Sequence, residues 1–356
     1  MPSSLAELET QGYLKSFDEV HQEVAEWHDL RHPDRVIDLS QLIVTEKLNI
    51  RVPGLGILEM TRWAKTQIGN TLGIKWDKWF ATKTRAIPPR EIQEELARRF
   101  NRLPGMRRMI RSRKHEVTTA RSDGVLEAFL SPTYEKIDDI RIFDRLRDRF
   151  ADRMSEMRLL RHPSRTFTGD WSWGWGGDRT SHYVFLTGEE HDLGGGGVPD
   201  NHLPGFLLKN SEVGSASLSM DDFWLRVVCM SGLLARTDNR RLLYRQHRRI
   251  EDEDLEALMG GALDRLEVRH SEFLDKLVES RGLRVEDPPE VLESFLSKCK
   301  ESTNKFVEQA QEAWEEDRHF TRFAVALAIT RAAQRTRDLD RRTDFEHLAG
   351  RFLLID

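Results

Sequence analysis

The residue types in this sequence that are best suited to a chemical role are arginine and lysine, and they concentrate in RRFNRLPGMRRMIRSRKHEV at residues 98–117. From Lys83 to Arg121 there are twelve Lys or Arg against four acids, a local net charge of +8. Contacts with nucleic-acid phosphates need cations at intervals, and a helix that leads into a basic loop supplies them. The residues with this predicted role are Arg98, Arg99, Arg102, Arg107, Arg108, Arg111, Arg113, Lys114 and Arg121.

A second basic cluster, RRLLYRQHRR at residues 240–249, directly follows a predicted strand. It adds Arg240, Arg241, Arg245, Arg248 and Arg249 to the predicted phosphate contacts. Each cluster alone has a simpler interpretation, a solvated helix face. Two basic clusters that flank one β-sheet favour a surface for a polyanion, and they predict nucleic-acid binding.

Three tryptophans alternate with small residues in TGDWSWGWGGDRTSHY at residues 168–183. As a strand, this segment places Trp171, Trp173 and Trp175 on one face, at a spacing that suits the stacking of bases on aromatic rings. The alternative is that the same face packs onto the core or onto a neighbouring subunit. We include the three tryptophans among the predicted nucleic-acid-binding residues.

Histidines near the middle of the chain are the best resource for a metal site, but their spacing fits no standard metal-binding pattern. They are His162, His182, His191 and His202, with Asp178 and Asp192 near them. The two cysteines lie elsewhere in the sequence. We therefore expect neither a metal ion nor another cofactor.

Two pairs of adjacent acids, Asp138-Asp139 and Asp221-Asp222, could hold Mg²⁺ in a nuclease. They fall where turns or helix N-caps are expected, and there a short carboxylate accepts hydrogen bonds from backbone N–H groups. Capping is the favoured interpretation. Since the sequence also lacks a Ser or Cys nucleophile with a convincing partner, we favour a non-enzymatic protein.

The first of three expected regions, residues 1–114, is an N-terminal helical region that contains the basic segment. Residues 14–110 are expected to be mainly helical, and the first helix has Ser16 as N-cap with Glu19 three residues later. A second helix is predicted from a shared apolar face, and a third covers residues 91–103. The shared face of the second helix consists of Leu58, Ala64, Ile68 and Leu72.

The second region, residues 115–250, is expected to be a β-rich core with the Trp/Gly-rich insert. Strand-forming residues flank a turn signal at 122–124, and a helix follows with Ile140, Phe143, Leu146 and Phe150 at helical spacing. HYVFLTG and FLLKNSEVGSASLSM predict strands, whereas DDFWLRVVCMSGLL is compatible with a helix or a strand. Asn210, Ser211 and Glu212 are expected to hydrogen-bond a strand end or a bulge.

The third region, residues 251–356, is predicted to be almost continuously helical. Within it, residues 286–317 carry ten acids against three lysines, a local net charge of -7. The three regions together predict an α+β fold with a central antiparallel sheet, helices before it and a C-terminal helical bundle.

Four segments of the chain resemble parts of one family. They are TQIGNTLGIKWDKWF, RSDGVLEAFLSPTYEKIDD, KNSEVGSASLSMDDFWLRVVCMSGL and RTDFEHLAG. They are similar to segments of the phage- and plasmid-borne proteins grouped as domain of unknown function 932, and the resemblance spans residues 58–350. It implies a mobile-element setting and an α+β fold, without an established reaction.

The composition is that of a soluble globular protein, with 38% hydrophobic and 32% charged residues, a mean hydropathy of -0.58 and a net charge of -5. The first residues lack the pattern of a signal peptide, and the longest apolar run, FAVALAI, is too short to cross a bilayer. We therefore expect a cytoplasmic protein without membrane contact. Cys229 and Cys299 are expected to be buried thiols, because two cysteines form no disulfide framework.

The function that these patterns predict is binding of single-stranded DNA or RNA during replication, recombination or defence of a mobile element, with assembly into a homo-oligomer by analogy. One alternative is a divalent-metal nuclease, which converging carboxylates would favour. The other is a protein-binding or structural factor, which ion pairs between the basic clusters and helices 286–317 would favour.

Overall fold

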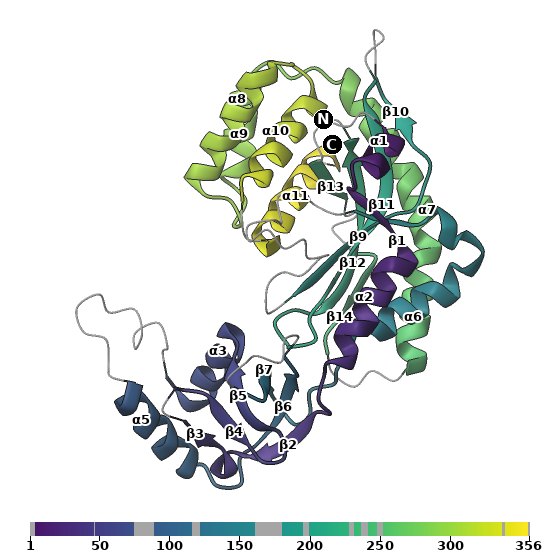
Figure 1. The fold of residues 1–356 in the computed structure, drawn as a ribbon. Coiled ribbons are helices and arrows are strands. Elements are labelled where there is room, and N and C mark those ends of the chain that lie inside the picture. The colour runs from purple at the N-terminus through teal and green to yellow at the C-terminus, as the bar shows by residue number, and fades with distance from the viewer. Residues whose placement is uncertain are drawn as a thin grey trace.

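The computed structural model describes residues 4–45, 47–74, 89–115, 122–160, 180–194, 199–227, 231–235, 241–247, 252–336 and 339–354. These residues form an α+β protein with an eight-stranded sheet, sheet A, and a six-stranded sheet, sheet B (Figure 1). The predicted α+β class and the C-terminal helices are confirmed. Sheet A is the expected antiparallel sheet, whereas sheet B was not expected.

Sheet A has the order β1-β8-β9-β11-β12-β13, with β10 beside β11 and β14 beside β12. Its described pairs are antiparallel, and its longest strands are β11 (Asn201–Asn210) and β12 (Leu218–Arg226). Gly214 lies between them with φ 75°, a left-handed conformation that favours glycine. The other strands are β1 (Leu14–Ser16), β8 (Arg158–Leu160), β9 (Ser181–Leu186), β10 (His191–Asp192), β13 (Ser231–Ala235) and β14 (Leu243–Arg245).

Helices α2 (Phe17–Asp29), α6 (Asp139–Arg149) and α7 (Asp252–Gly282) pack against one face of sheet A and bury a core rich in aromatic rings. Helix α2 begins as predicted: Ser16 caps it, and Glu19 completes a capping box. In the core, Phe185 of β9 stacks on Phe206 of β11 with 4.6 Å between ring centroids. This core holds β11 and β12 rigidly, so the side chains at their ends have fixed positions.

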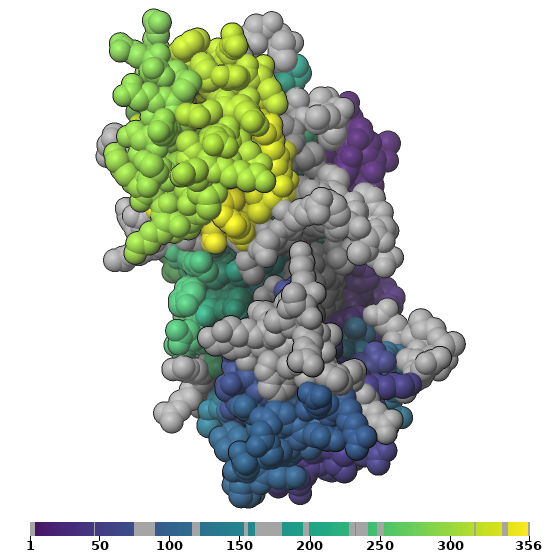
Figure 2. Space-filling model, turned by 90° about the vertical axis from the view of Figure 1, so that its left-hand side faces the viewer, coloured from purple at the N-terminus to yellow at the C-terminus, as the bar shows by residue number. Residues whose placement is uncertain are grey.

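The C-terminal helices form a second core with Trp224 and the end of α7. Helix α10 is buried over most of its surface because it lies inside this bundle, and α11 packs on β13. The helices are α8 (Pro288–Leu296), α9 (Asn304–Asp317), α10 (Arg322–Gln334) and α11 (Leu339–Leu354). The bundle lies at the end of the molecule opposite to α5, as Figure 2 shows.

Sheet B has the order β2-β6-β7-β5-β4-β3, in which only β5 and β7 are parallel among the described pairs. Helices α3 and α5 cover it and bury an aliphatic core with Phe100 and Phe129. Helix α3 ends at Gly73, which has a left-handed conformation as its C-cap. The elements are β2 (Arg35–Asp38), β3 (Ile43–Val44), β4 (Ile50–Val52), β5 (Gly56–Met60), α3 (Arg62–Leu72), α5 (Pro89–Asn101), β6 (Arg107–Arg113) and β7 (Gly124–Leu130).

The expectation that residues 14–110 are mainly helical is wrong, because β2 to β5 lie within this range and β6 begins in it. Leu58 belongs to β5 and not to the helix that follows. The sequence does not separate the two, because an apolar residue six positions before Ala64 fits a helix face as well as a short strand. The strand that pairs with β7 is the basic segment 107–113 itself, which was expected to be a loop. The ambiguous segment 221–234 is strand in its described part, as β12 and β13.

The remaining described elements are α1 (Leu5–Thr10) and two short 3₁₀ helices at Leu39–Gln41 and Ala151–Glu156. Within the described ranges, no helix combines the length and the apolar character that crossing a bilayer requires.

Candidate nucleic-acid surface and the charge network behind it

Strand β6 divides the predicted basic segment between the outside and the inside of the protein. Successive side chains of a strand point to opposite faces. Ile110 packs into the core of sheet B, whereas Met109 and Arg111 face sheet A and the residues before α6. Arg111 is only 1% exposed, so its predicted contact with a phosphate is wrong.

The guanidinium of Arg111 donates four hydrogen bonds to protein acceptors. Its Nη1 donates to the carbonyl oxygen of Glu212 at 2.8 Å, and its Nη2 donates to Asp138 Oδ1 at 2.8 Å. Asp34 accepts from Nε at 3.3 Å and from Nη2 at 3.1 Å, the paired geometry that suits arginine and a carboxylate. Arg111 therefore joins β6 of sheet B to the end of β11 in sheet A.

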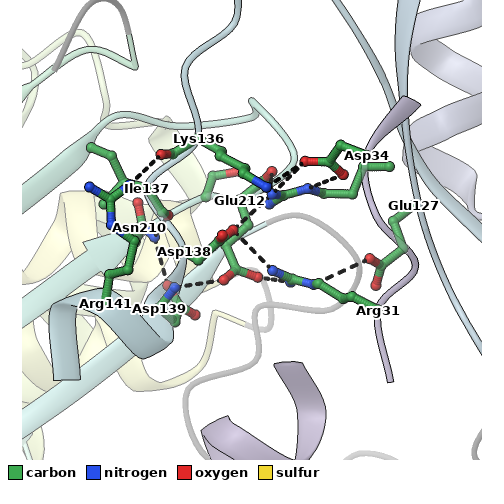
Figure 3. Close-up of polar contacts among 12 residues, drawn as sticks. Arg31, Asp34, Glu127, Lys136, Ile137, Asp138, Asp139, Arg141, Asn210 and Glu212 are labelled. Carbon is green, nitrogen blue, oxygen red and sulfur yellow. Dashed lines mark hydrogen bonds and ion pairs between the residues drawn. The ribbon is translucent and has the colours of Figure 1, made fainter. Parts of the chain in front are cut away.

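A second buried arginine, Arg31, binds the same group of carboxylates (Figure 3). Its Nη1 lies 3.2 Å from Asp138 Oδ1, and its Nη2 forms an ion pair with Glu212. Its Nε lies 3.8 Å from Glu127 Oε2, beyond hydrogen-bond distance. We call this group the junction network; it consists of Arg31, Asp34, Arg111, Glu127, Asp138, Asp139, Asn210 and Glu212.

Asp139 anchors the sheet A side of the junction network. Tyr183 of β9 donates its hydroxyl proton to Asp139 Oδ2 at 2.8 Å, and Asn210 Nδ2 donates to Asp139 Oδ1 at 2.6 Å. Glu212 Oε1 accepts from the backbone N–H of Asp139 at 2.6 Å. Asn210 and Glu212, which were predicted to hydrogen-bond a strand end or a bulge, instead contact the start of α6. Ser211 Oγ accepts from the backbone N–H of Ser215 at 2.9 Å.

The electrostatics of the network favour its ionised state. Burial raises the pKa of Asp138, but Arg111 and Arg31 outweigh burial and leave that pKa below its ordinary value. Burial lowers the pKa of Arg111, yet Asp138 and Asp34 outweigh it and raise the pKa above the ordinary value. Asp138 and Arg111 therefore favour each other's charged form, whereas burial and the neighbouring Arg111 lower the pKa of Arg31. The contacts of the network link the two sheets.

The interpretation of both acid pairs as side-chain caps is wrong. Asp138 occupies the N-cap position of α6, but its side chain makes no capping hydrogen bond, because the two arginines bind it. Asp221 and Asp222 lie in the middle of β12 and are buried. Their apolar neighbours Met220 and Phe223 continue the strand on both sides, which overrides the turn propensity of aspartate.

Three cations of the first cluster lie just after α5 and at the start of β6. Arg102 and Arg107 are exposed, and Arg108 is half-buried. Lys114 is also exposed, but it follows the other end of β6. Gly105, at φ 82°, makes the turn between α5 and β6, and its N–H donates to Asp38 Oδ2 at 2.7 Å. The turn therefore presents the cations before and after it from one ordered connection.

Other members of the first cluster already have partners within the protein. Arg98 and Arg99 both bind Glu95 of α5, and Arg99 also donates to the carbonyl oxygen of Leu72 at 2.5 Å. Arg113 lies 3.1 Å from Glu127 and above the ring of Trp27. Arg98 keeps much of its surface in solvent, whereas Arg113 is mostly covered.

The described part of the second cluster lies beside the junction network. His247 stacks on Tyr134, with 5.2 Å between ring centroids, and burial lowers its pKa to about 4. Arg241 lies 3.8 Å from Asp221 and 5.4 Å from the ring of Tyr244, and Arg245 ends β14. The ring of Tyr244 is 55% exposed. This part of the chain therefore presents an arginine and an accessible aromatic ring together.

Several predicted site residues lie outside the described residues. They are Arg121, Trp171, Trp173, Trp175, Arg240, Arg248 and Arg249. The same holds for Cys229, whereas Cys299 is buried as predicted. Among the described residues there is no group of three or more His, Cys, Asp or Glu side chains arranged to hold a metal ion.

The sequence interpretation missed Arg31, Asp34, Glu127 and Tyr244. Arg31 and Asp34 lie in a short connection between α2 and β2, where isolated charges usually face solvent. Glu127 is the one acid in the apolar run GVLEAFL, and a charge inside such a run was a usable signal for a buried ion pair. Tyr244 lies within the second basic cluster, but the sequence prediction does not include it among the nucleic-acid-binding residues.

Comparison with known protein families, with curated proteins and with solved structures finds no match to this chain.

Proposed function

We propose that this protein binds single-stranded nucleic acid through the outer surface of its sheet B unit. The observation that carries the proposal is a separation of charge between the sheet B unit and the rest of the chain. Residues 31–130, which build sheet B with α3 and α5, contain 20 Lys or Arg and 11 Asp or Glu, a net charge of +9. The rest of the chain contains 35 and 49, a net charge of -14. A cationic unit on an anionic protein attracts a polyanion to one end of the molecule.

The position of the acidic helices supports this proposal over a purely structural role. All described acidic side chains between residues 286 and 316 are exposed. Among the described residues, no salt bridge joins the arginines of 98–113 to these helices. The bundle and α5 lie at opposite ends in Figure 2. The outer cations of sheet B are therefore not neutralised by the acidic segment.

Aromatic rings argue for a single strand as the ligand. Tyr244 lies in β14 of sheet A, outside the sheet B unit, and offers an exposed ring beside Arg241. Every base has a face that can stack on such a ring. The tryptophans at 171, 173 and 175 add further rings to the proposal. The resemblance to domain of unknown function 932 suggests the setting, which is replication, recombination or defence of a mobile element in the cytoplasm. Assembly into a homo-oligomer follows from analogy with strand-coating proteins.

The test is an anisotropy titration of the protein with labelled single- and double-stranded oligonucleotides at several salt concentrations, with and without Mg²⁺. We expect tighter binding of the single strand, with log K falling linearly with log salt by about 0.7 per contacted phosphate. Cleavage of the oligonucleotide in the Mg²⁺ series would instead identify a nuclease.

A triple variant, Arg102→Ala, Arg107→Ala and Arg108→Ala, assigns the surface. We expect the salt slope to flatten by about 2, since three cations are removed. The matched control is Lys298→Ala, Lys300→Ala and Lys305→Ala, which removes the same charge from exposed sites on the acidic helices. Equal weakening by both triple variants would show that only total charge matters and would remove sheet B from the interface.

A further inference from the structure

The sheet B unit is an insertion between two helices that pack on sheet A. The chain enters the unit after α2, through residues 30–34, and leaves it before α6, through residues 131–138 (Figure 1). The two connections lie side by side: Lys136 Nζ is 3.1 Å from Asp34 Oδ2, and the junction network joins them as well. A unit that is attached through two adjacent connections can turn about them.

Each unit has a hydrophobic core of its own. The described core of sheet B consists of residues between 37 and 129, and the described cores of sheet A and of the C-terminal bundle contain none of these residues. A small apolar cluster joins the units, and it contains Val213 of sheet A together with Met109 and Leu130 of sheet B. Separate cores with a small shared cluster favour relative motion of the two units.

The turn between β11 and β12, residues 211–217, holds the sheet B unit from the sheet A side. The carbonyl oxygen of Val213 accepts one hydrogen bond from Trp63 Nε1 and another from Gln67 Nε2, both at 2.9 Å. Both donors belong to α3. Gln67 Oε1 also accepts from the backbone N–H of Phe129 at 2.7 Å, so one side chain connects α3, β7 and the turn.

Gly214 allows the turn to approach sheet B closely. Its φ of 75° is unfavourable for other residues, and a Cβ at this position would lie 2.8 Å from Leu130 Cδ2 and 3.3 Å from Tyr134 Cε2. Any other residue would strain the turn and push it away from sheet B. Because α3 lies outside both connections, a contact between the turn and α3 restricts rotation of the unit.

We infer that Val213 and Gly214 form a latch, which fixes the orientation of the sheet B unit on sheet A, and that the unit turns about its two connections when the latch is released. Glu212, the residue before the latch, belongs to the junction network, which forms the pivot. The orientation decides whether one strand contacts both Arg107 on sheet B and Tyr244 on sheet A. This last consequence rests on the proposed function, whereas the latch itself does not.

Distances between two spin labels test the latch in the full chain without nucleic acid. The labels are attached to Glu91→Cys on α5 and Ala257→Cys on α7, two exposed positions, after Cys229 and Cys299 have been replaced by alanine. We expect one narrow distance distribution when the latch is unaltered. Gly214→Ala should raise the weight of a second distance at least about 5-fold, because it weakens the hydrogen bonds to the turn.

Two further variants make this measurement specific. Trp63→Phe keeps an aromatic ring and removes one donor to the latch, so it should shift the distribution in the same direction as Gly214→Ala. Gly12→Ala is the matched control, because Gly12 also has a left-handed φ of 72° but a Cβ there meets no described atom within 4 Å. It should leave the distribution narrow.

Three results would overturn the inference. The first is a distribution that is already broad with the latch unaltered. The second is a distribution that stays narrow in Trp63→Phe and in Gly214→Ala while circular dichroism shows folded protein. The third is equal broadening in Gly12→Ala.

A double-mutant cycle tests the consequence for binding. Tyr244→Ala should weaken binding of a single strand by about 5-fold in the wild type, but by less than about 2-fold in Gly214→Ala, because the released unit no longer aligns the ring with Arg107. Equal losses in both backgrounds would overturn the link between the latch and binding. If the wild type binds no oligonucleotide, the proposed function fails, and the distance distributions still decide whether the latch exists.

Discussion

The charges inside the junction network and those on the outer surface of sheet B come from one stretch of sequence but have opposite roles. Arg111 is enclosed by Asp34, Asp138 and the carbonyl oxygen of Glu212. Arg107, four residues earlier on the same strand, is exposed to solvent. The comparison shows that a basic segment is not a uniform surface, because the position along the strand decides which arginine meets buried carboxylates and which one faces solvent.

The physical difference is the surrounding medium. In the interior, paired charges interact strongly, and removing one leaves its partners buried without compensation. On the surface, an ion pair contributes little because water and salt screen it. The surface cations are therefore nearly irrelevant to stability but remain available to a phosphate backbone.

The largest effect should follow from Arg111→Met, which keeps much of the side-chain volume and removes the charge. Asp34 and Asp138 lose a shared partner, so the free energy of unfolding should fall by about 3–5 kcal/mol. Urea denaturation followed by circular dichroism measures it. Arg107→Met, on the same strand, is the control and should change stability by less than about 0.5 kcal/mol. Similar losses in both variants would refute the division between inner and outer arginines.

The sequence predicts the elements around the network better than the network itself. Ser16 and Glu19 specify the start of α2 through local contacts alone, and the structure confirms it. The partners of Arg111 lie 77, 27 and 101 residues away along the chain, so no local pattern identifies them. The short strand 107–113 also lacks the apolar alternation that marks a half-buried strand, because its buried residues include Arg111 and Ser112.

Asp222 is a buried carboxylate whose pKa is raised, whereas the pKa of Asp138 in the junction network is lowered. It is fully buried, its oxygens have no hydrogen-bond partner among the described residues, and Arg269 Nη1 is 3.6 Å away. Burial raises its pKa to about 7, while Arg269 opposes the shift and Asp221 and Glu272 add to it. Asp138 has the lowered pKa because two arginines contact it closely.

The raised pKa of Asp222 makes a pH-dependent prediction. Because the folded state holds this proton more tightly than the unfolded state, the contribution to stability is full below about pH 4 and is lost as the pH rises through 7. Between pH 5 and 8 the wild type should lose about 2–3 kcal/mol relative to Asp222→Asn, which cannot ionise. Urea melts of both proteins at each pH measure the difference.

The wild type must be compared with Asp222→Asn because four histidines change the stability with pH in the direction opposite to Asp222. Burial lowers the pKa of each, so each destabilises the folded state as the pH falls below about 6.5. They are His32, His202, His247 and His270. Their effect is common to the wild type and to Asp222→Asn and cancels in the difference. A difference that stays constant from pH 5 to 8 would show that Asp222 titrates normally.

A smaller effect is expected from a single outer cation. Arg107→Ala should weaken binding of a single strand by about 3- to 10-fold at low salt and reduce the salt slope by about 0.7, with no change in the urea midpoint. Anisotropy titrations at several salt concentrations measure both quantities. Lys300→Ala on the acidic end is the single-charge control. A changed urea midpoint with an unchanged salt slope of binding would show that Arg107, like Arg111, contributes to the fold and does not contact the strand.

The smallest effect should come from Tyr244, where the interaction is stacking and not charge. Tyr244→Ala removes the exposed ring beside Arg241, and we expect a loss of about 1 kcal/mol of binding, the lower end of the range for one stacked base. Tyr244→Phe keeps the ring and should bind as the wild type does. Since stacking needs no counterion release, the salt slope should be the same in all three proteins. If Tyr244→Phe binds as weakly as Tyr244→Ala, the hydroxyl and not the ring contacts the strand, and the case for a single-stranded ligand loses its described aromatic partner.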